Sequence, residues 1–154
     1  MAVEANIKIT GLTGTRRKLA EVEAILNSRE PMSNIVNDVR ARILDRTSRG
    51  LDYMGRRFAP YSKAYAKRKK SGKVDLKQSG EMLDSIQSTV ISPQRGEVAV
   101  MSSRRQVIAN IHNTGTGKHP KREFMNIPMS ALREIVKRHI DDKILEVAKR
   151  LRMR

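Results

Sequence analysis

The first residues of the chain alternate apolar and polar side chains. Val3, Ala5, Ile7 and Ile9 are apolar, and single polar residues separate them. A period of two residues places the apolar side chains on one face of an extended backbone. The pattern therefore predicts a half-buried strand over residues 3–9.

Two amphipathic helices are predicted next. Thr15 can cap the first helix, whose apolar positions follow helical spacing and which should end near Ser28. Pro31 suits the first turn of the second helix, because the backbone N–H that proline lacks would have no partner there. An apolar stripe then continues from Ile35 to about Arg46, as expected for a helix with one buried face.

The middle of the chain predicts a loop, a basic helix and a short helix. Residues 48–60 are expected to form the loop, and residues 61–70 the basic helix, which Ser71 and Gly72 end. A short helix over residues 80–86 should turn Leu83 and Ile86 inward.

A β-hairpin and a long helix are predicted for the remainder. Apolar and β-branched runs over 88–91 and 97–101 flank the sequence SPQRG, which is typical of a hairpin connection between antiparallel strands. One or two helical turns around residues 107–111, a loop over 113–120 and a short strand over 124–127 should follow.

The final helix should begin with Ser130 as its cap and keep an apolar face from Leu132 to Leu151. Its first half is expected to pack on the sheet. Its second half is expected to pack on the first helix or on a neighbouring subunit. The whole pattern predicts an α+β fold in a single domain over residues 1–154, with a small antiparallel sheet packed against amphipathic helices and a long C-terminal helix.

Composition narrows the possible chemistry. The 154 residues include no Cys and no Trp, so a disulfide, a thiolate metal site and a cysteine nucleophile are excluded. The apolar stretches are far shorter than the roughly 20 residues of a membrane-spanning helix. A soluble protein made in the cytoplasm, without a membrane partner, is therefore expected.

Positive charge is concentrated in the middle of the chain. The sequence has 32 Lys and Arg against 16 Asp and Glu. Between Asp52 and Asp75 the basic residues, with no acidic one among them, are Arg56, Arg57, Lys63, Lys67, Arg68, Lys69, Lys70 and Lys73. Such a patch favours acidic protein surfaces or nucleic acid as partners. Tyr61 and Tyr65 within it either stack on bases or form the buried face of the basic helix.

No catalytic or metal-binding arrangement can be recognised. His112, His119 and His139 lack the spacing of a helical metal pair, and His112 is interpreted as a polar residue that closes a loop. The Gly115–Lys118 segment lacks the first glycine and the hydroxyl of a phosphate-binding loop, so it is interpreted as a flexible basic loop. We therefore expect no enzyme activity and no cofactor.

Three segments carry a set of motifs in a fixed order. Residues 52–62 read DYMGRRFAPYS and are followed by YAKRKKSG; residues 76–86 read LKQSGEMLDSI; residues 109–127 contain IHNTG and then PKREFMNI. In order and spacing they resemble the phage virion morphogenesis family of tail completion proteins, which occurs in tailed phages and prophages. The matching positions are Asp52, Gly55, Phe58, Pro60, Ser62, Gly80, His112, Gly115, Arg122 and Phe124.

The resemblance implies a noncatalytic structural protein of the virion at the head–tail junction. It covers roughly residues 50–130, and the residues before 48 carry no matching segment. Copies are expected to form a homo-oligomeric ring that contacts other phage neck and tail proteins, with nonspecific contact to packaged DNA. The alternative is a small nonspecific nucleic-acid-binding protein, which charge alone favours.

The motif residues also suggest a scaffold. Gly55 and Pro60 can form a tight entry to the basic helix, and Gly80 permits a turn. Arg122 and Phe124 alternate along an extended segment and should face opposite sides. One of them is therefore expected in the core and the other at a partner.

Overall fold

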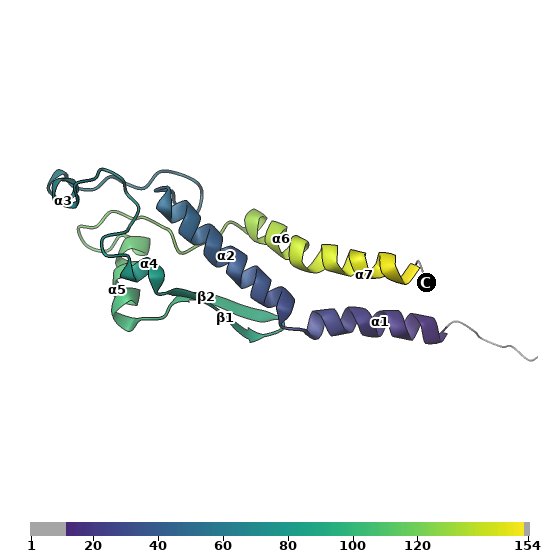
Figure 1. Ribbon diagram of the computed structural model, residues 1–154. Helices are drawn as coiled ribbons and strands as arrows, with labels where there is room; N and C mark the ends of the chain where they lie inside the picture. The colour runs from purple at the N-terminus through teal and green to yellow at the C-terminus, as the bar shows by residue number, and fades with distance from the viewer. Residues whose placement is uncertain (1–11, 153–154) are drawn as a thin grey trace, which may run out of the picture.

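The computed structural model describes residues 12–152 and has an α+β fold, as the sequence predicts (Figure 1). The predicted strand over 3–9 lies outside these residues. In chain order the elements are α1 (Leu12–Asn27), α2 (Glu30–Ser48), α3 (Lys63–Lys69), α4 (Glu81–Asp84), β1 (Ile86–Ser92), β2 (Arg95–Val100), α5 (Ser103–Thr114), α6 (Met129–Val136), the π-helical turn η1 (Lys137–Asp141) and α7 (Asp142–Arg152).

Helix α2 is the central element. It lies between the β-hairpin on one side and α6 on the other, and it contacts both (Figure 1). Its predicted apolar stripe is buried at Ile35 and Ile43. The Arg40 side chain also donates a 2.6 Å hydrogen bond from Nε to the Ile86 carbonyl at the start of β1. Apolar burial and this polar contact together hold α2 on the sheet.

The hairpin pairs β1 and β2 antiparallel, as predicted from the SPQRG connection. The register joins Ile86 to Val100 and Val90 to Gly96, with an irregularity just before the turn. Gly96 lies against α2 so closely that an added Cβ would be 2.4 Å from Cγ1 of Val36. Because real Cβ atoms do not approach so closely, a side chain here would push the hairpin away from the helix.

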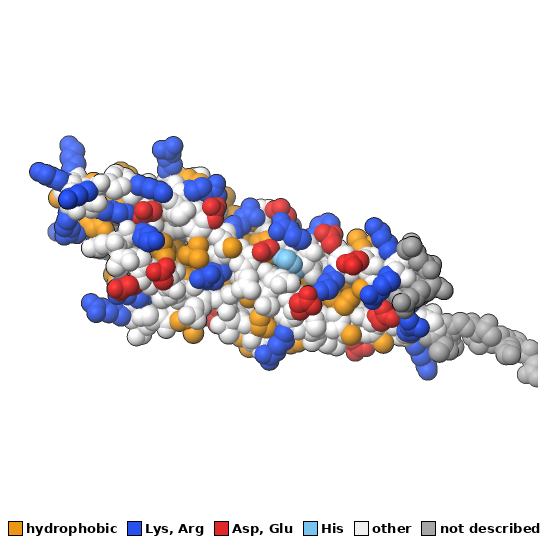
Figure 2. Space-filling view, viewed as in Figure 1, with side chains coloured by type: hydrophobic (Ala, Val, Ile, Leu, Met, Phe, Trp, Pro, Cys, Tyr) orange, Lys and Arg blue, Asp and Glu red, His pale blue; other side chains and the backbone are white. Residues whose placement is uncertain are grey.

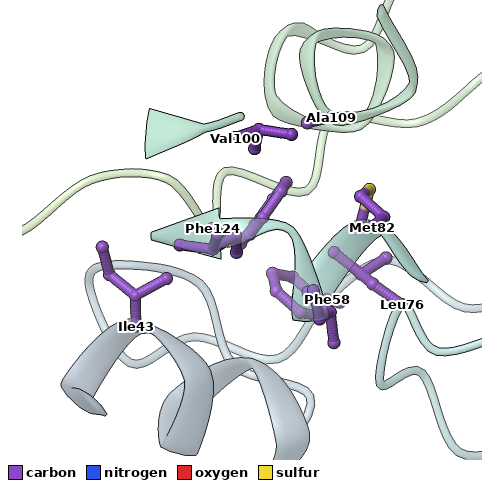
Figure 3. Close-up of a cluster of buried hydrophobic side chains, with 9 residues drawn as sticks. Ile43, Phe58, Leu76, Met82, Val100, Ala109 and Phe124 are labelled. Carbon is purple, nitrogen blue, oxygen red and sulfur yellow. The ribbon is translucent and has the colours of Figure 1, made fainter. Parts of the chain in front are cut away.

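The core gathers apolar side chains from α2, the loops, α4, the hairpin and α5 (Figure 3). Phe124 and Ile86 are fully buried at its centre. Leu76 and Leu83 are also buried there, which confirms the inward orientation predicted for Leu83 and Ile86. With both phenylalanines of the chain in this one cluster, Phe58 and Phe124 supply its largest apolar side chains.

The C-terminal helices form an arm with α1. Helices α1 and α7 lie side by side and run in opposite directions (Figure 1). Val147 is buried, and Arg150 pairs with Glu21 at 3.2 Å. Of the two partners expected for the second half of the final helix, the intramolecular one, α1, is thus observed.

Other predictions for the C-terminal part were wrong. The first half of the final helix packs on α2 and not on the sheet. The helix begins after Pro128, so Ser130 lies in its first turn and is not the cap. A π-helical turn also interrupts it at Lys137–Asp141. This wider turn rotates the following residues about the helix axis, so that α6 and α7 present their apolar faces to different partners.

Further boundaries differ from the prediction. Helix α1 already includes Leu12, so Thr15 lies within it and is not its cap. Ile86, predicted at the end of a short helix, is the first residue of β1. The helix predicted as one or two turns around 107–111 is α5, with 12 residues. Residues 124–127 form no strand, because their carbonyl groups are bound by a side chain of α2 instead of by a neighbouring strand.

Candidate partner-binding site

The basic helix α3 is short and capped at both ends. The Ser62 hydroxyl accepts a 3.2 Å hydrogen bond from the Tyr65 backbone N–H. At the other end Lys70 is in the left-handed conformation, with φ of 53°, and its N–H donates to the carbonyls of Ala66 and Lys67. These caps limit the helix to Lys63–Lys69, slightly shorter than predicted.

Most predicted patch residues are exposed around this helix. Figure 2 shows Lys and Arg side chains gathered at the end of the molecule that carries α3. The exposed members without a carboxylate partner among the described residues are Arg57, Lys63, Lys67, Arg68, Lys70 and Lys73. Arg56 is exposed but pairs with Asp52 at 2.8 Å. The six side chains without a carboxylate partner in the described part of the chain, together with Arg56, form what we call the basic end.

Lys69 does not belong to the exposed patch, contrary to the prediction. Its side chain is only 13% exposed and forms an ion pair with Asp75. Its ammonium also lies 5.0 Å from the centre of the Tyr61 ring. Burial is the largest single effect and opposes the charged form, but the hydrogen bond and charge of Asp75 together with Tyr61 outweigh it, and the pKa of Lys69 is raised. Lys69 thus fastens α3 to the following loop.

The two tyrosines pack against each other, but only Tyr65 lies on α3, because Tyr61 precedes the helix. The rings of Tyr61 and Tyr65 lie 4.7 Å apart, and both side chains are half-buried. The Tyr61 hydroxyl accepts a hydrogen bond from the Leu76 N–H, and the Arg122 guanidinium lies 5.1 Å from the Tyr61 ring. Protein groups therefore already pack around the Tyr61 ring.

Asp52 organises the loop before the basic helix. Its carboxylate accepts hydrogen bonds from the backbone N–H groups of Met54 and Arg56 at 2.9 and 2.8 Å. The Arg56 side chain donates a third bond. Burial disfavours the charged form, but these bonds hold the pKa of Asp52 below its usual value. Gly55 lies in this turn, and Phe58 leads from it into the core.

Phe124 lies in the core cluster, as expected for one of the alternating pair, whereas Arg122 is also buried and is not an exposed residue. Arg122 is 4% exposed, and its side chain donates hydrogen bonds of 2.9 Å to the carbonyls of Ala59 and Pro60. Its backbone N–H donates to the His112 carbonyl at 2.7 Å. A buried arginine is tolerated here because fixed carbonyl oxygens replace water around its charge.

Arg46 is a structural residue that the sequence analysis missed. It is 6% exposed, and its Nη2 donates to the carbonyls of Phe124 and Asn126 at 2.6 and 2.7 Å. Its position in the sequence could have indicated burial, because Arg46 continues the apolar stripe of α2 three residues after Ile43. Arg46 and Arg122 together fix residues 122–126 by side-chain hydrogen bonds, where no neighbouring strand among residues 12–152 pairs with this segment.

The Gly115 turn directs the next loop back over the molecule. Gly115 ends α5 with φ of 76°, and an added Cβ would lie 2.8 Å from the backbone nitrogen of Lys121. Only glycine accommodates both this φ and this approach. Lys118 and His119, in the loop interpreted as merely flexible, are thereby placed beside His112.

These loops enclose a cleft of about 430 Å³, which we call the basic cleft. All three motif segments line it, through Pro60 and Ser62, Leu76 and Gly80, and His112 and Arg122. The other residues around it include Tyr61, Tyr65, Met82, Arg105, Ile108, Lys118, His119 and Pro120. Within residues 12–152, no Asp or Glu lines it.

His112 lies at the inner wall of the basic cleft, at the end of α5, and does not simply close a loop. Its ring is 6.4 Å from that of His119, and its Nδ1 is buried with no hydrogen-bond partner among the described residues. Burial, followed by the positive charges of Arg122 and His119, lowers the pKa of His112. The cleft is therefore a positively charged environment that would favour an anion.

In the part of the chain that the structure describes, no group of three His, Cys, Asp or Glu side chains could hold a metal ion. No helix among residues 12–152 is long and apolar enough to cross a membrane. Comparisons of the chain with protein-family profiles, with curated proteins and with solved structures gave no match.

Proposed function

We propose that this chain is a noncatalytic structural protein of a tailed bacteriophage, which completes or joins the tail at the head–tail junction. The observation that carries the proposal is the convergence of the three motif segments on the basic cleft, although they span residues 52 to 127. The three segments that carry the resemblance thus build one surface.

The contacts of the motif residues support a scaffold role. Asp52 binds backbone N–H groups, Arg122 binds backbone carbonyls, and Phe58 and Phe124 are buried in the core. Asp52 fixes the turn within its own segment, whereas Arg122, Phe58 and Phe124 hold segments against one another. This pattern is typical of residues that shape a binding surface.

The two ends of the molecule suit assembly into a ring. The basic end carries unpaired cations, whereas the arm of α1 and α7 exposes Leu19 and Leu145, which are 65% and 54% exposed. A cyclic ring uses a head-to-tail interface between two different patches of each subunit. We propose that the basic end contacts neck or tail proteins and packaged DNA in the virion, after synthesis in the host cytoplasm.

The test is the position of the protein in the particle. Antibodies raised against the purified chain, with gold labels, should mark the junction of head and tail in phage particles from the strain that encodes it. Deletion of the gene should leave filled heads without joined tails. Normal infectious particles after deletion, or labels on no virion, would contradict the proposal.

Nonspecific nucleic-acid binding is the second candidate, and the exposed cations of the basic end favour it. A DNA titration at increasing salt distinguishes it, because the logarithm of a DNA-binding constant falls with log salt by about 0.9 per neutralised phosphate on duplex DNA. Replacement of Lys63, Lys67 and Arg68 by Gln should reduce that slope if DNA is the partner. A complex with neck or tail proteins that forms without DNA supports the structural role instead.

A further inference from the structure

The basic cleft has the size of a ligand site. Its volume of about 430 Å³ falls within the range of about 300–1,000 Å³ that is usual for such sites. Its wall is partly apolar, through Leu76, Met82 and Ile108. Polar groups from α5 and the loop after it face the same space. This combination fits a ligand with both an apolar and an ionised part.

The charge inside the cleft is only partly compensated. Arg105 forms an ion pair with Glu81. Arg122 donates to two backbone carbonyls, and no carboxylate among residues 12–152 pairs with it or with Lys118. His112 adds a buried ring nitrogen without a hydrogen-bond partner in that part of the chain. An incoming anion would therefore meet unneutralised cations and a free polar atom.

We propose that the basic cleft binds a carboxylate side chain of an acidic peptide segment, with a neighbouring apolar residue of that peptide against Leu76, Met82 and Ile108. Lys118 and Arg122 attract the carboxylate, and His112 and His119 lie beside it. The identity of the peptide as part of a neck or tail protein rests on the proposed function. The carboxylate site itself rests on the cleft.

The surroundings of the tyrosines favour a peptide over nucleic acid. Single-stranded nucleic acids bind through aromatic faces on which bases stack. Here Tyr61 packs against Tyr65, with Lys69 and Arg122 at 5.0 and 5.1 Å from its ring centre. The Tyr65 ring has Arg68 at 5.1 Å. A base would have to displace these groups, whereas a carboxylate needs no aromatic face.

Proton binding should be coupled to peptide binding. Two charged groups face His112: Arg122 from the following segment and His119 from the loop. The same cleft is also surrounded by Lys118, the two tyrosines and Arg105, which pairs with Glu81. A bound carboxylate offsets the positive charges that disfavour protonation of His112. Affinity for an acidic peptide should therefore increase as the pH falls toward about 5.5, where a glutamate with a pKa near 4.3 remains largely ionised.

The experiment uses the full chain and an amidated, fluorescein-labelled hexapeptide of alternating Glu and Leu. Fluorescence anisotropy measures its binding to the native protein and to Lys118→Gln, with Lys63→Gln as the matched control. Both lysines are exposed and have no ion pair among the described residues, but only Lys118 lines the cleft. Circular dichroism checks that both variants fold.

The proposal expects Lys118→Gln to weaken binding by about tenfold and Lys63→Gln by less than about threefold, because a direct hydrogen bond to a charged group contributes more than a distant charge. The corresponding Gln and Leu peptide should bind at least about tenfold more weakly than the acidic one. Equal losses in the two variants, or no binding of the acidic peptide, would overturn the proposal.

Competition separates the ligand classes. Single-stranded DNA that displaces the peptide through Lys118, and binds more tightly than it, would assign the cleft to nucleic acid and refute the peptide site. If inorganic phosphate displaces the peptide and binds with the same affinity as the peptide, the cleft is a site for any small anion, and the peptide proposal is also refuted. Neither result concerns the position of the protein in the virion, so failure here is distinguishable from failure of the proposed function.

Discussion

Replacement of Arg122 by methionine tests whether this residue holds the cleft together or merely occupies it. The change removes the two hydrogen bonds to the carbonyls of Ala59 and Pro60 and the contact with the Tyr61 ring. Hydrogen bonds to a charged group contribute about 1.5–3 kcal/mol each. The desolvation cost of the buried cation disappears at the same time, which offsets part of the loss. We expect a decrease of about 2–4 kcal/mol in the free energy of unfolding.

Urea denaturation followed by far-ultraviolet circular dichroism measures this change. For a chain of this length, a decrease of that size should lower the melting temperature by about 4–16 °C. Arg122→Lys keeps the charge but loses the planar fork, and should fall between the native protein and the methionine variant. Lys121→Gln is the matched control, because Lys121 is an exposed neighbour that pairs with Glu123. An Arg122→Met protein as stable as the control would refute the structural role of Arg122.

Three further predictions test other parts of the fold. Lys69→Gln should lower the unfolding free energy by about 1–2 kcal/mol in urea denaturation, because it leaves the partly buried Asp75 without its ion pair. The exposed control Lys67→Gln should have little effect, and equal effects of the two substitutions would show that the Lys69 ion pair does not stabilise the fold. Gly96→Ala should cost about 1–3 kcal/mol, measured in the same way, since the new methyl group would meet α2; unchanged stability would show that the hairpin can move away freely. The pKa of His112 is lowered in the folded state, so the unfolded chain binds the proton at a higher pH than the folded chain does. The free energy of unfolding should therefore decrease as the pH falls below about 6.5, until the lowered pKa is passed. The decrease should be at most about 1.4 kcal/mol per pH unit. A His112→Gln variant should lack that part of the pH dependence of thermal melting, and an unchanged pH profile would contradict the assignment.

The sequence alone determined the elements whose formation depends on neighbouring residues. The helical spacing of α1 and α2, the basic helix, and the hairpin around the SPQRG turn all follow from periodicity and turn chemistry. The inward orientation of Leu83 and Ile86 was also predictable. The basic character of the cleft could be predicted only in part. The sequence shows a concentration of positive charge around residue 65, but it does not show that Lys118 and His119 line the same cleft.

Only the tertiary structure decided which charged residues are buried. Arg46 and Arg122 are buried because backbone carbonyls distant in sequence, such as Phe124 for Arg46 and Ala59 for Arg122, replace water around their guanidinium groups. Local composition cannot distinguish such an arginine from a solvated one, since its partners lie 78 and 63 residues away. The absence of a strand at 124–127 has the same origin, because a side chain of α2 binds the carbonyl groups that a neighbouring strand would otherwise bind.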